Sequence, residues 1–269
     1  MLSCESLYRR DTYLNKNNEL ILNQPIIEYD LKSANTSLCR FYNLLSEKKI
    51  KEIENLPKHD RVVVIGKLQR NDREFKEKFN NAFKEMRRMF FEENQLDEED
   101  ILSVKKDAIF TFKRCKHTQF GDSCKFVKKN KYTSFIYLNR MIELYFNRGG
   151  ICDNKPRVDV KGISDISLAK HEDYLLDFFA KLFTYLEDGD EKLLFKFISH
   201  FVSQYKHLQL PVGYYREFNN LSVIRVKDLD ATFNDERFLP FADPQNHLDI
   251  DYNFANVIIP LINLILRYH

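Results

Sequence analysis

The sequence predicts an α+β fold, and three features carry that prediction. "PIIEYD" (25–30) is a short apolar run with β-branched residues after a proline, which is typical of a buried strand. "ILSVKKDAIFTFKRC" (101–115) contains two β-rich runs separated by a tight polar step, as a β-hairpin does. Residues 72–94 and 168–210 instead repeat apolar side chains at steps of three and four, the spacing of amphipathic helices.

Composition sets the limits within which a function can be sought. The chain has 269 residues, of which 43% are hydrophobic and 30% charged, enough for one large or two small domains with a real core. Its 42 basic and 40 acidic residues give a net charge of +2, so any contact with nucleic acid must come from local clusters of charge. No apolar run reaches the roughly 20 residues of a membrane span, and the polar N-terminus lacks a signal-peptide core. Five cysteines at irregular spacing suit a reducing compartment. We therefore expect a cytoplasmic protein with no membrane partner.

The remaining elements follow in chain order. Residues 1–24 form a polar lead-in, with a short hairpin expected around "NNEL". "SANTSLCRFYNLLSEKKIKEIENL" (33–56) predicts a helix that Ser33 or Asn35 would cap. "RVVVIGK" (61–67) predicts a second strand or a buried extended segment, and "VDVKGISD" (158–165) predicts a short strand. A final apolar helix is expected, broken near Pro260.

Two aspartates at the ends of predicted strands suggest chemistry. Asp30 ends the apolar run 25–30 and is followed by small polar residues, while Asp107 falls at the tip of the predicted hairpin. Two neighbouring carboxylates repel each other unless a cation neutralises them, and oxygen ligands with open positions for phosphates favour Mg²⁺. Two such ions about 3.5–4 Å apart promote in-line displacement at phosphorus. The alternative is that Asp30 caps the helix that follows.

The motifs around these aspartates resemble family B DNA polymerases. "DLKSANTS" (30–37) resembles the first palm motif, D-x-x-S-L-Y-P-S, and matches it at Asp30, Ser33 and Ser37. "KEKFNNAF" (76–83) is similar to the fingers-helix motif K-x-x-x-N-S-x-Y, with Phe83 in place of the tyrosine. "SVKKDAIF" (103–110) occupies the place of the D-T-D-S hairpin: Asp107 matches its second aspartate, while Lys105 and Ala108 replace the first aspartate and the serine.

Three later segments resemble the family's nucleic-acid-binding elements, in the family's order. "KKNKY" (128–132) is similar to the K-K-x-Y segment, which follows the minor groove of the primer-template. "DVKGI" (159–163) resembles a later Lys-Gly element, and "HLDIDYNFANVIIPLINLIL" (247–266) resembles the end of the thumb. Together the matches run from about residue 25 to residue 265.

The resemblance implies an architecture and a set of roles. The architecture is a polymerase-like palm, an antiparallel sheet with packed helices, plus helical fingers and a helical thumb. After the lead-in 1–24, the palm would span 25–165 with short fingers inserted at about 40–95, and the thumb-like region would span 166–269. The reaction would extend a nucleic-acid 3′-hydroxyl with nucleoside triphosphates, without proofreading, and two Mg²⁺ or Mn²⁺ ions would bind Asp30 and Asp107. The implied nucleotide-binding residues are Ser33, Asn35, Arg70, Arg73, Lys76, Asn80 and Phe83; the implied nucleic-acid-binding residues are Lys128, Lys129, Lys131, Tyr132 and Lys161.

Departures from the family pattern leave alternatives open. Asn35 stands where the family has a tyrosine that excludes a 2′-hydroxyl, which favours a primase-like enzyme or a terminal transferase with relaxed sugar selectivity. Lys105 and Ala108 beside Asp107 favour a catalytically inactive, polymerase-derived nucleic-acid-binding or scaffold protein. A helix-rich interaction domain with coincidental matches is the third reading. The expected partners are a nucleoside triphosphate, a primer-template or single-stranded nucleic acid, and accessory replication proteins. A small polymerase core suggests a phage or a mobile element, and then a location in the host cytoplasm.

Overall fold

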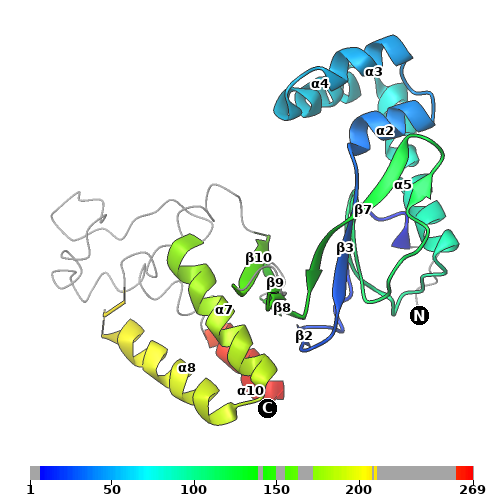
Figure 1. The fold of residues 1–269 in the computed structure, drawn as a ribbon. Helices are drawn as coiled ribbons and strands as arrows, with labels where there is room; N and C mark the ends of the chain where they lie inside the picture. Colours follow the sequence, from blue (N-terminus) through cyan, green and yellow to red (C-terminus); the bar gives the residue numbers. More distant parts are fainter. Residues whose placement is uncertain are drawn as a thin grey trace, which may run out of the picture. The chain divides into compact units, whose positions relative to one another are not determined.

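The chain forms two compact units, each built from two stretches of sequence. The structure is a computed structural model that describes residues 7–138, 142–149, 155–162, 172–207, 209–210 and 259–268 (Figure 1). Unit 1 comprises Met1–Lys16 and Pro25–Lys131, and unit 2 comprises Asn17–Gln24 and Tyr132–His269. Both units combine helices with antiparallel strand pairs, so the predicted α+β class is confirmed. The chain passes between the units at 16/17, 24/25 and 131/132, whereas the expected boundaries were at 24/25 and 165/166.

Unit 1 is built on a six-stranded sheet with the hairpin at its centre. The strand order is β1-β4-β5-β3-β7-β6. The strands are β1 (Thr12–Leu14), β4 (Ile101–Lys105), β5 (Ala108–Thr111), β3 (Ile26–Leu31), β7 (Cys124–Tyr132) and β6 (Gln119–Phe120). The strand predicted at 25–30 and the hairpin predicted at 101–115 are therefore confirmed as β3 and β4–β5. Figure 1 shows β3 and β7 running side by side.

The helices of unit 1 follow β3 in one run: α5 packs on one face of the sheet, and α3 and α4 pack on the other helices. They are α2 (Ala34–Phe41), α3 (Glu47–Glu54), α4 (Lys58–Asn71) and α5 (Arg73–Glu93). The predicted helix at 72–94 is α5, and the Asp72 side chain caps it by accepting a hydrogen bond from the Phe75 amide at 2.9 Å. Its apolar face packs on the sheet, where the Phe90 ring lies 5.6 Å from the ring of Tyr29. This side of the sheet carries the hydrophobic core of the unit.

Three sequence predictions for this region are wrong. Residues 61–67 lie inside α4, where Ile65 is buried but the Val62 side chain is 56% exposed, so the β-branched run reflects neither a strand nor burial. The helix expected over 33–56 is two helices, because Asn43 takes a left-handed conformation (φ 51°) after α2. No hairpin forms around "NNEL": β1 pairs with β4, and β2 (Leu20–Ile21) pairs with β8 of unit 2.

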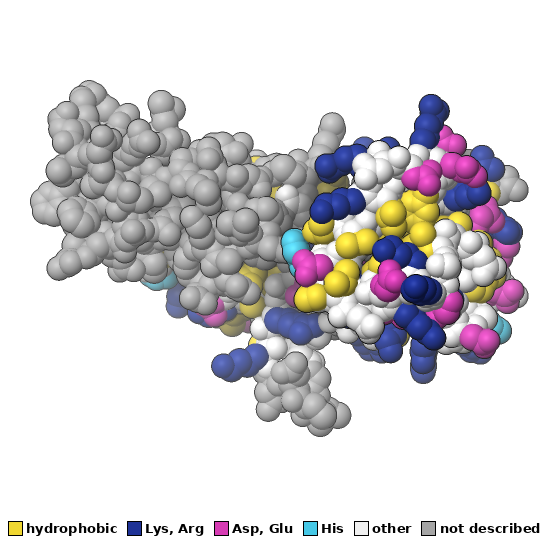
Figure 2. Space-filling model, turned by 90° about the horizontal axis from the view of Figure 1, so that it is seen from above, with side chains coloured by type: hydrophobic (Ala, Val, Ile, Leu, Met, Phe, Trp, Pro, Cys, Tyr) yellow, Lys and Arg dark blue, Asp and Glu magenta, His cyan; other side chains and the backbone are white. Residues whose placement is uncertain are grey.

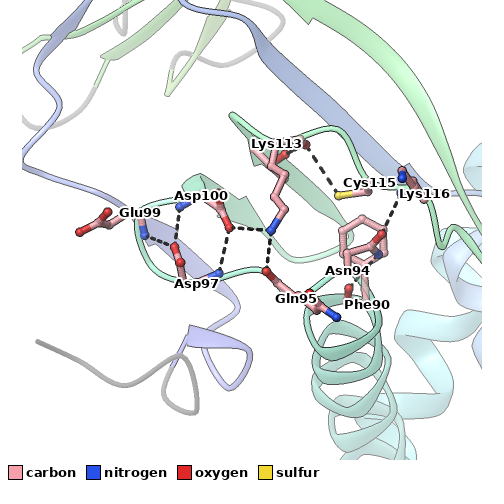
Figure 3. Close-up of polar contacts among 10 residues, drawn as sticks. Phe90, Asn94, Gln95, Asp97, Glu99, Asp100, Lys113, Cys115 and Lys116 are labelled. Carbon is pink, nitrogen blue, oxygen red and sulfur yellow. Dashed lines mark hydrogen bonds and ion pairs between the residues drawn. The ribbon is translucent and has the colours of Figure 1, made fainter.

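A buried asparagine fastens the end of α5 to the loop that follows the hairpin (Figure 3). The Asn94 Oδ1 atom accepts hydrogen bonds from the amides of Lys116 and His117, each at 2.9 Å. Its Nδ2 atom donates to the carbonyl oxygens of Phe90 and His117. Nearby, the Lys113 ammonium donates to the Gln95 carbonyl at 2.7 Å. These bonds fix the base of the hairpin, whose opposite end carries Asp107.

Unit 2 packs helices on one face of a four-stranded antiparallel sheet. The strand order is β10-β9-β8-β2, with β10 (Arg157–Lys161), β9 (Ile142–Asn147) and β8 (Ser134–Leu138). Among the described residues of the unit, the helices are α7 (Glu172–Asp188), α8 (Glu191–Lys206) and α10 (Ile259–Tyr268). The helices predicted at 168–210 are thus confirmed by α7 and α8, and the strand predicted at 158–165 by β10. The rings of Phe146 on β9 and Phe183 on α7 stack at 5.0 Å in a core that α10 shares. Pro260 lies in the first turn of α10, where its missing amide hydrogen costs nothing. Most of the predicted thumb-end motif, residues 247–258, lies outside the described residues.

Candidate active site in unit 1

One face of the unit 1 sheet carries acidic and basic side chains in register. Across β3, β5 and β4, Asp30 pairs with Ala108, and Ala108 pairs with Lys105. Directly cross-paired residues, and residues two apart on one strand, share a face of a sheet. Glu28 therefore shares this face with Asp30, while Tyr29 points to the opposite face and into the core beneath α5.

Asp107 lies beside Asp30 because of the hairpin turn. The turn consists of Lys106 and Asp107, and Lys106 adopts the left-handed conformation (φ 56°) that two-residue hairpin loops require. The Leu31 amide donates a hydrogen bond to the Asp107 carbonyl at 3.1 Å, which fastens the tip of the hairpin to the end of β3. The turn that contains Asp107 therefore lies next to the end of β3, where Asp30 is.

A buried arginine holds the same turn from α5. The Arg87 side chain is only 1% exposed, and its guanidinium donates to the Lys106 and Tyr8 carbonyls, each at 2.8 Å, and to Asp11 Oδ1 at 3.0 Å. Burial lowers the pKa of Arg87, and the charges of Asp11 and Asp107 oppose that shift. Arg87 therefore ties the backbone next to Asp107 to the long helix.

Lys129 on β7 supplies a cation to the acidic side chains of β3. Its ammonium lies 3.4 Å from Glu28 Oε1 and 3.9 Å from Asp30 Oδ2. The Glu28 side chain is 2% exposed, and it also accepts a hydrogen bond from Asn130 Nδ2 at 2.6 Å. Since a buried carboxylate needs partners, β7 is matched to β3 by charge as well as by backbone pairing.

The electrostatics of the site favour the arrival of positive charge. Burial raises the pKa of Asp30; Lys129 lowers it, and the neighbouring charges of Asp107 and Glu28 raise it further. Burial alone would lower the pKa of Lys129, but the charges of Glu28, Asp30 and Asp107 outweigh this effect and raise it. The charge of Asp107 thus acts on Asp30, and a cation beside Asp30 favours the ionised form of its carboxyl group.

The amino end of α2 begins just after Asp30. Ser33 is its N-cap residue and has a left-handed backbone (φ 49°), so Ser33 holds the predicted position but not by a side-chain cap. Ser37 Oγ donates to the Lys32 carbonyl at 2.8 Å, which closes the strand-to-helix turn. The first turn of α2 contains no acidic residue, and Asn35 there is half-buried. Helix amino ends of this kind attract phosphate groups. Asp30 itself is not the cap.

The residues expected from the fingers motif occupy different environments. Arg70, at the end of α4, and Lys76, in the first turns of α5, are exposed, and Arg73 pairs with Glu77 at 3.0 Å. Asn80 is half-buried, whereas Phe83 lies in the core, edge-to-face on Phe79 and under the Lys106 ammonium at 4.9 Å. Within the described residues, no hydrogen bond or ion pair joins any of these five to Asp30 or Asp107. Figure 2 looks onto α3 and α4 and shows apolar side chains bordered by Lys and Arg.

The residues expected to grip nucleic acid are divided between the units. Lys128 and Lys131 of β7 are exposed, while Lys129 is engaged as described above. Tyr132 belongs to unit 2 and is fully buried, with its hydroxyl donating to Asp159 Oδ2 at 2.5 Å. Lys161, also in unit 2, is half-exposed on β10 and pairs in register with Glu143.

The donor set at Asp30 and Asp107 fits a divalent cation that uses few protein ligands. Across the described ranges, no group of three or more His, Cys, Asp or Glu side chains is arranged to hold a metal ion. Mg²⁺ is commonly held by one or two carboxylates and otherwise by water and substrate phosphates. The Lys129 ammonium, 3.9 Å from Asp30, shows that this place accepts a positive charge. Asp30 and Asp107 are the two carboxylates here that could hold such an ion.

The chain matches one protein-family model along almost its whole length. That family is described as Bacteriophage PBS1 gene 130 protein, and the match covers residues 2–267. The chain belongs to this phage protein family. No curated protein matches it. In the described part of the chain, no helix is both long and apolar enough to cross a membrane.

Two residues of the site, Glu28 and Asn130, were missed by sequence reasoning. Glu28 had a signal, since it lies two residues before Asp30 and strand periodicity puts the two on one face. Asn130 had no such signal, because its partner Glu28 is distant in sequence. Arg87 belongs to the basic stripe that the sequence indicates on helix 72–94, but its guanidinium is buried and donates to the Lys106 carbonyl.

Proposed function

We propose that unit 1 is the catalytic core of a metal-dependent nucleotidyltransferase that extends a nucleic-acid 3′-hydroxyl, in the manner of a small family B DNA polymerase. The observation that carries the proposal is that the hairpin tip with Asp107 is hydrogen-bonded to the end of β3 next to Asp30, and that the charge of Asp107 acts on Asp30. The α+β fold of unit 1, with its central hairpin and with α5 packed on one face, supports a palm. The phage family to which the chain belongs is compatible with a replication role.

Each part of the site has a task in this reaction. The Asp30 and Asp107 carboxylates would hold Mg²⁺ or Mn²⁺, which when bound stabilise negative charge on the attacking and leaving oxygens. The amino end of α2, with Ser33 and Asn35, would bind the triphosphate, and the exposed Lys76, Arg70 and Arg73 of α4 and α5 would supply further positive charge. Lys128 and Lys131 on β7 contact phosphates of the nucleic acid.

The bond changes are those of an in-line displacement. The 3′-oxygen attacks the α-phosphorus, the bond from that phosphorus to the α–β bridging oxygen breaks, and pyrophosphate leaves with the electron pair. The proton of the 3′-hydroxyl passes to water. The protein contributes mainly position and charge, since phosphoryl-type transfers need little else from side chains.

Primer extension tests the proposal. The protein is incubated with a labelled primer-template, Mg²⁺ or Mn²⁺, and either dNTPs or NTPs. We expect metal-dependent extension that falls by about a hundredfold or more in Asp30→Asn and Asp107→Asn, since each removes charge at the reacting phosphate. Asp122→Asn, an exposed aspartate of the β6–β7 loop in the same unit, is the matched control. Extension that persists in both site variants would refute the mechanism. Use of NTPs as well as dNTPs would support the role of Asn35 in a primase-like or terminal-transferase activity.

A second function is favoured by one observation. Lys105 shares the cross-strand row of Asp30, with only the small Ala108 between them, so a fixed positive charge lies where the family pattern has an aspartate. A protein that binds nucleic acid without catalysis would tolerate this charge. It would show no extension with any metal or nucleotide, but would bind nucleic acid in a salt-dependent manner that Lys128→Met and Lys131→Met weaken.

A further inference from the structure

The pairing of Lys129 with two carboxylates distinguishes it from the other lysines of β7. Its side chain is 51% exposed, yet its ammonium lies 3.4 Å from Glu28 Oε1 and 3.9 Å from Asp30 Oδ2. Lys128 and Lys131, on either side of it, are exposed. A lysine that binds only a phosphate backbone does not require an ion pair with a buried glutamate. Such an ion pair is favourable only when other hydrogen bonds also satisfy the glutamate.

Glu28 is fixed in a position from which its carboxylate orients the Lys129 ammonium. Its carboxylate is buried, one oxygen accepts from Asn130 Nδ2 at 2.6 Å, and the other faces the Lys129 ammonium. Its position two residues before Asp30 on β3 fixes the distance between the two carboxylates that share the lysine. Glu28 therefore acts on Asp30 through Lys129.

We propose that Lys129 is the resident counter-ion of the Asp30–Asp107 pair and that Glu28 retains it when a divalent cation arrives, so that the Glu28–Lys129 pair sets the affinity of the site for the metal. The proposal rests on the proposed function, because it assumes that a metal binds Asp30 and Asp107. Lys129 and Glu28 are positioning residues in it, and neither contacts the reacting atoms. Without metal, the Lys129 ammonium neutralises the charge of the Asp30 carboxylate. With metal bound, the ammonium would remain paired with Glu28, and the metal ion would neutralise Asp30 instead.

The geometry gives the size of the effect. A metal about 2.0–2.1 Å from Asp30 Oδ2 would be at most about 6 Å from the Lys129 ammonium, which is 3.9 Å from the same oxygen. Repulsion between a divalent and a monovalent cation at that separation changes an equilibrium about tenfold even at the dielectric constant of water. Lys129→Met is therefore expected to tighten metal binding about tenfold. Glu28→Gln is expected to weaken metal binding about tenfold. The substitution removes a negative charge near the site, and Lys129 then has Asp30 as its remaining carboxylate partner.

Mn²⁺ binding to the full chain, without nucleotide or nucleic acid, tests the proposal. Free Mn²⁺ is measured by electron paramagnetic resonance during a titration, and thermal unfolding without metal confirms that each variant is folded. Lys125→Met is the matched control, because Lys125 is an exposed lysine of the same strand at an even spacing from Lys129. We expect tighter binding in Lys129→Met, weaker binding in Glu28→Gln and wild-type binding in Lys125→Met.

The outcomes separate the two proposals. Equal or weaker Mn²⁺ binding in Lys129→Met, with wild-type binding that depends on Asp30 and Asp107, would overturn the role of Lys129 and leave the proposed function intact. Binding by Lys129→Met but not by the wild type would support it strongly. No binding by either protein would overturn the metal site, and with it both proposals.

Discussion

Arg87 provides the strongest test of how the site is held, because the structure supplies both the perturbation and its control. In Arg87→Met the side chain keeps an unbranched apolar stem but loses the guanidinium and with it the hydrogen bonds to Tyr8 O, Lys106 O and Asp11 Oδ1. A hydrogen bond from a charged donor contributes about 1.5–3 kcal/mol, and the buried guanidinium no longer has to be desolvated in the variant. Asp11 is 57% exposed, so water replaces its partner. The net loss in free energy of unfolding is then about 2–3 kcal/mol.

Arg88 is the control, since it is the next residue of α5 and its ion pairs with Glu85 and Glu92 lie at the surface. Arg88→Met should change the free energy of unfolding little, because exposed ion pairs contribute little. Urea denaturation followed by far-UV circular dichroism measures both variants. Since Arg87 holds the carbonyl of Lys106, Arg87→Met should also weaken Mn²⁺ binding at temperatures where it remains folded. Equal stability of the two variants would refute the idea that Arg87 fastens the hairpin turn.

Three further predictions follow from single sites. The pKa of Asp30 is raised in the folded state, so between the usual value of 3.8 and the raised value the folded protein binds more protons than the unfolded chain, and its stability falls as pH rises. Asp30→Asn should therefore be more stable than the wild type at pH 7, as measured by urea denaturation. A loss of stability in this variant would contradict the argument. Burial raises the pKa of three thiols above the usual 9.0: those of Cys39 (about 12), Cys115 (about 11) and Cys124 (about 11). At pH 8 an alkylating reagent should therefore leave these thiols unmodified in the folded protein and modify them once denaturant is added, as measured by peptide mass spectrometry. A Cβ on Gly121 (φ 52°) would lie 3.0 Å from the Phe41 ring, so Gly121→Ala should lower the free energy of unfolding by about 1–2 kcal/mol. Gly66 lies in α4 with open space around it, so Gly66→Ala should raise the free energy of unfolding by up to about 1 kcal/mol. Thermal unfolding measures both variants, and a change of the same sign in both would contradict this prediction.

Local patterns were sufficient where one short segment decided the structure. The strand at β3, the hairpin turn at Lys106–Asp107 and the helix that begins after Asp72 each follow from periodicity or turn chemistry within a few residues. The same patterns failed for residues 61–67. There a run of β-branched residues suggested a strand, but Pro57 at the N-cap and helical continuity decided the outcome, and Val62 remained exposed.

Non-local pairing explains the rest of what the sequence did not reveal. Leu20 and Ile21 pair with Ile136 and Phe135, and no local signal selects partners so far along the chain. At the site, Asp30 and Asp107 were predicted together, whereas the association of Lys129 with Glu28 depends on β7 lying next to β3. Sequence reasoning therefore named Asp30 and Asp107 but not Glu28, and it predicted that Lys129 binds nucleic acid, whereas the Lys129 ammonium lies beside Glu28 and Asp30.

The short strand β2 has a consequence for biosynthesis. Residues 17–24 belong to unit 2, although the rest of that unit begins at Tyr132. During translation the apolar Leu20 and Ile21 therefore emerge early and wait for β8, a delay on the order of ten seconds at usual synthesis rates. Unit 2 cannot complete its sheet from the C-terminal part of the chain alone. Separate expression of residues 132–269 should give a product that lacks an edge strand and is prone to pair with other chains, so useful truncations must carry the N-terminal segment with them.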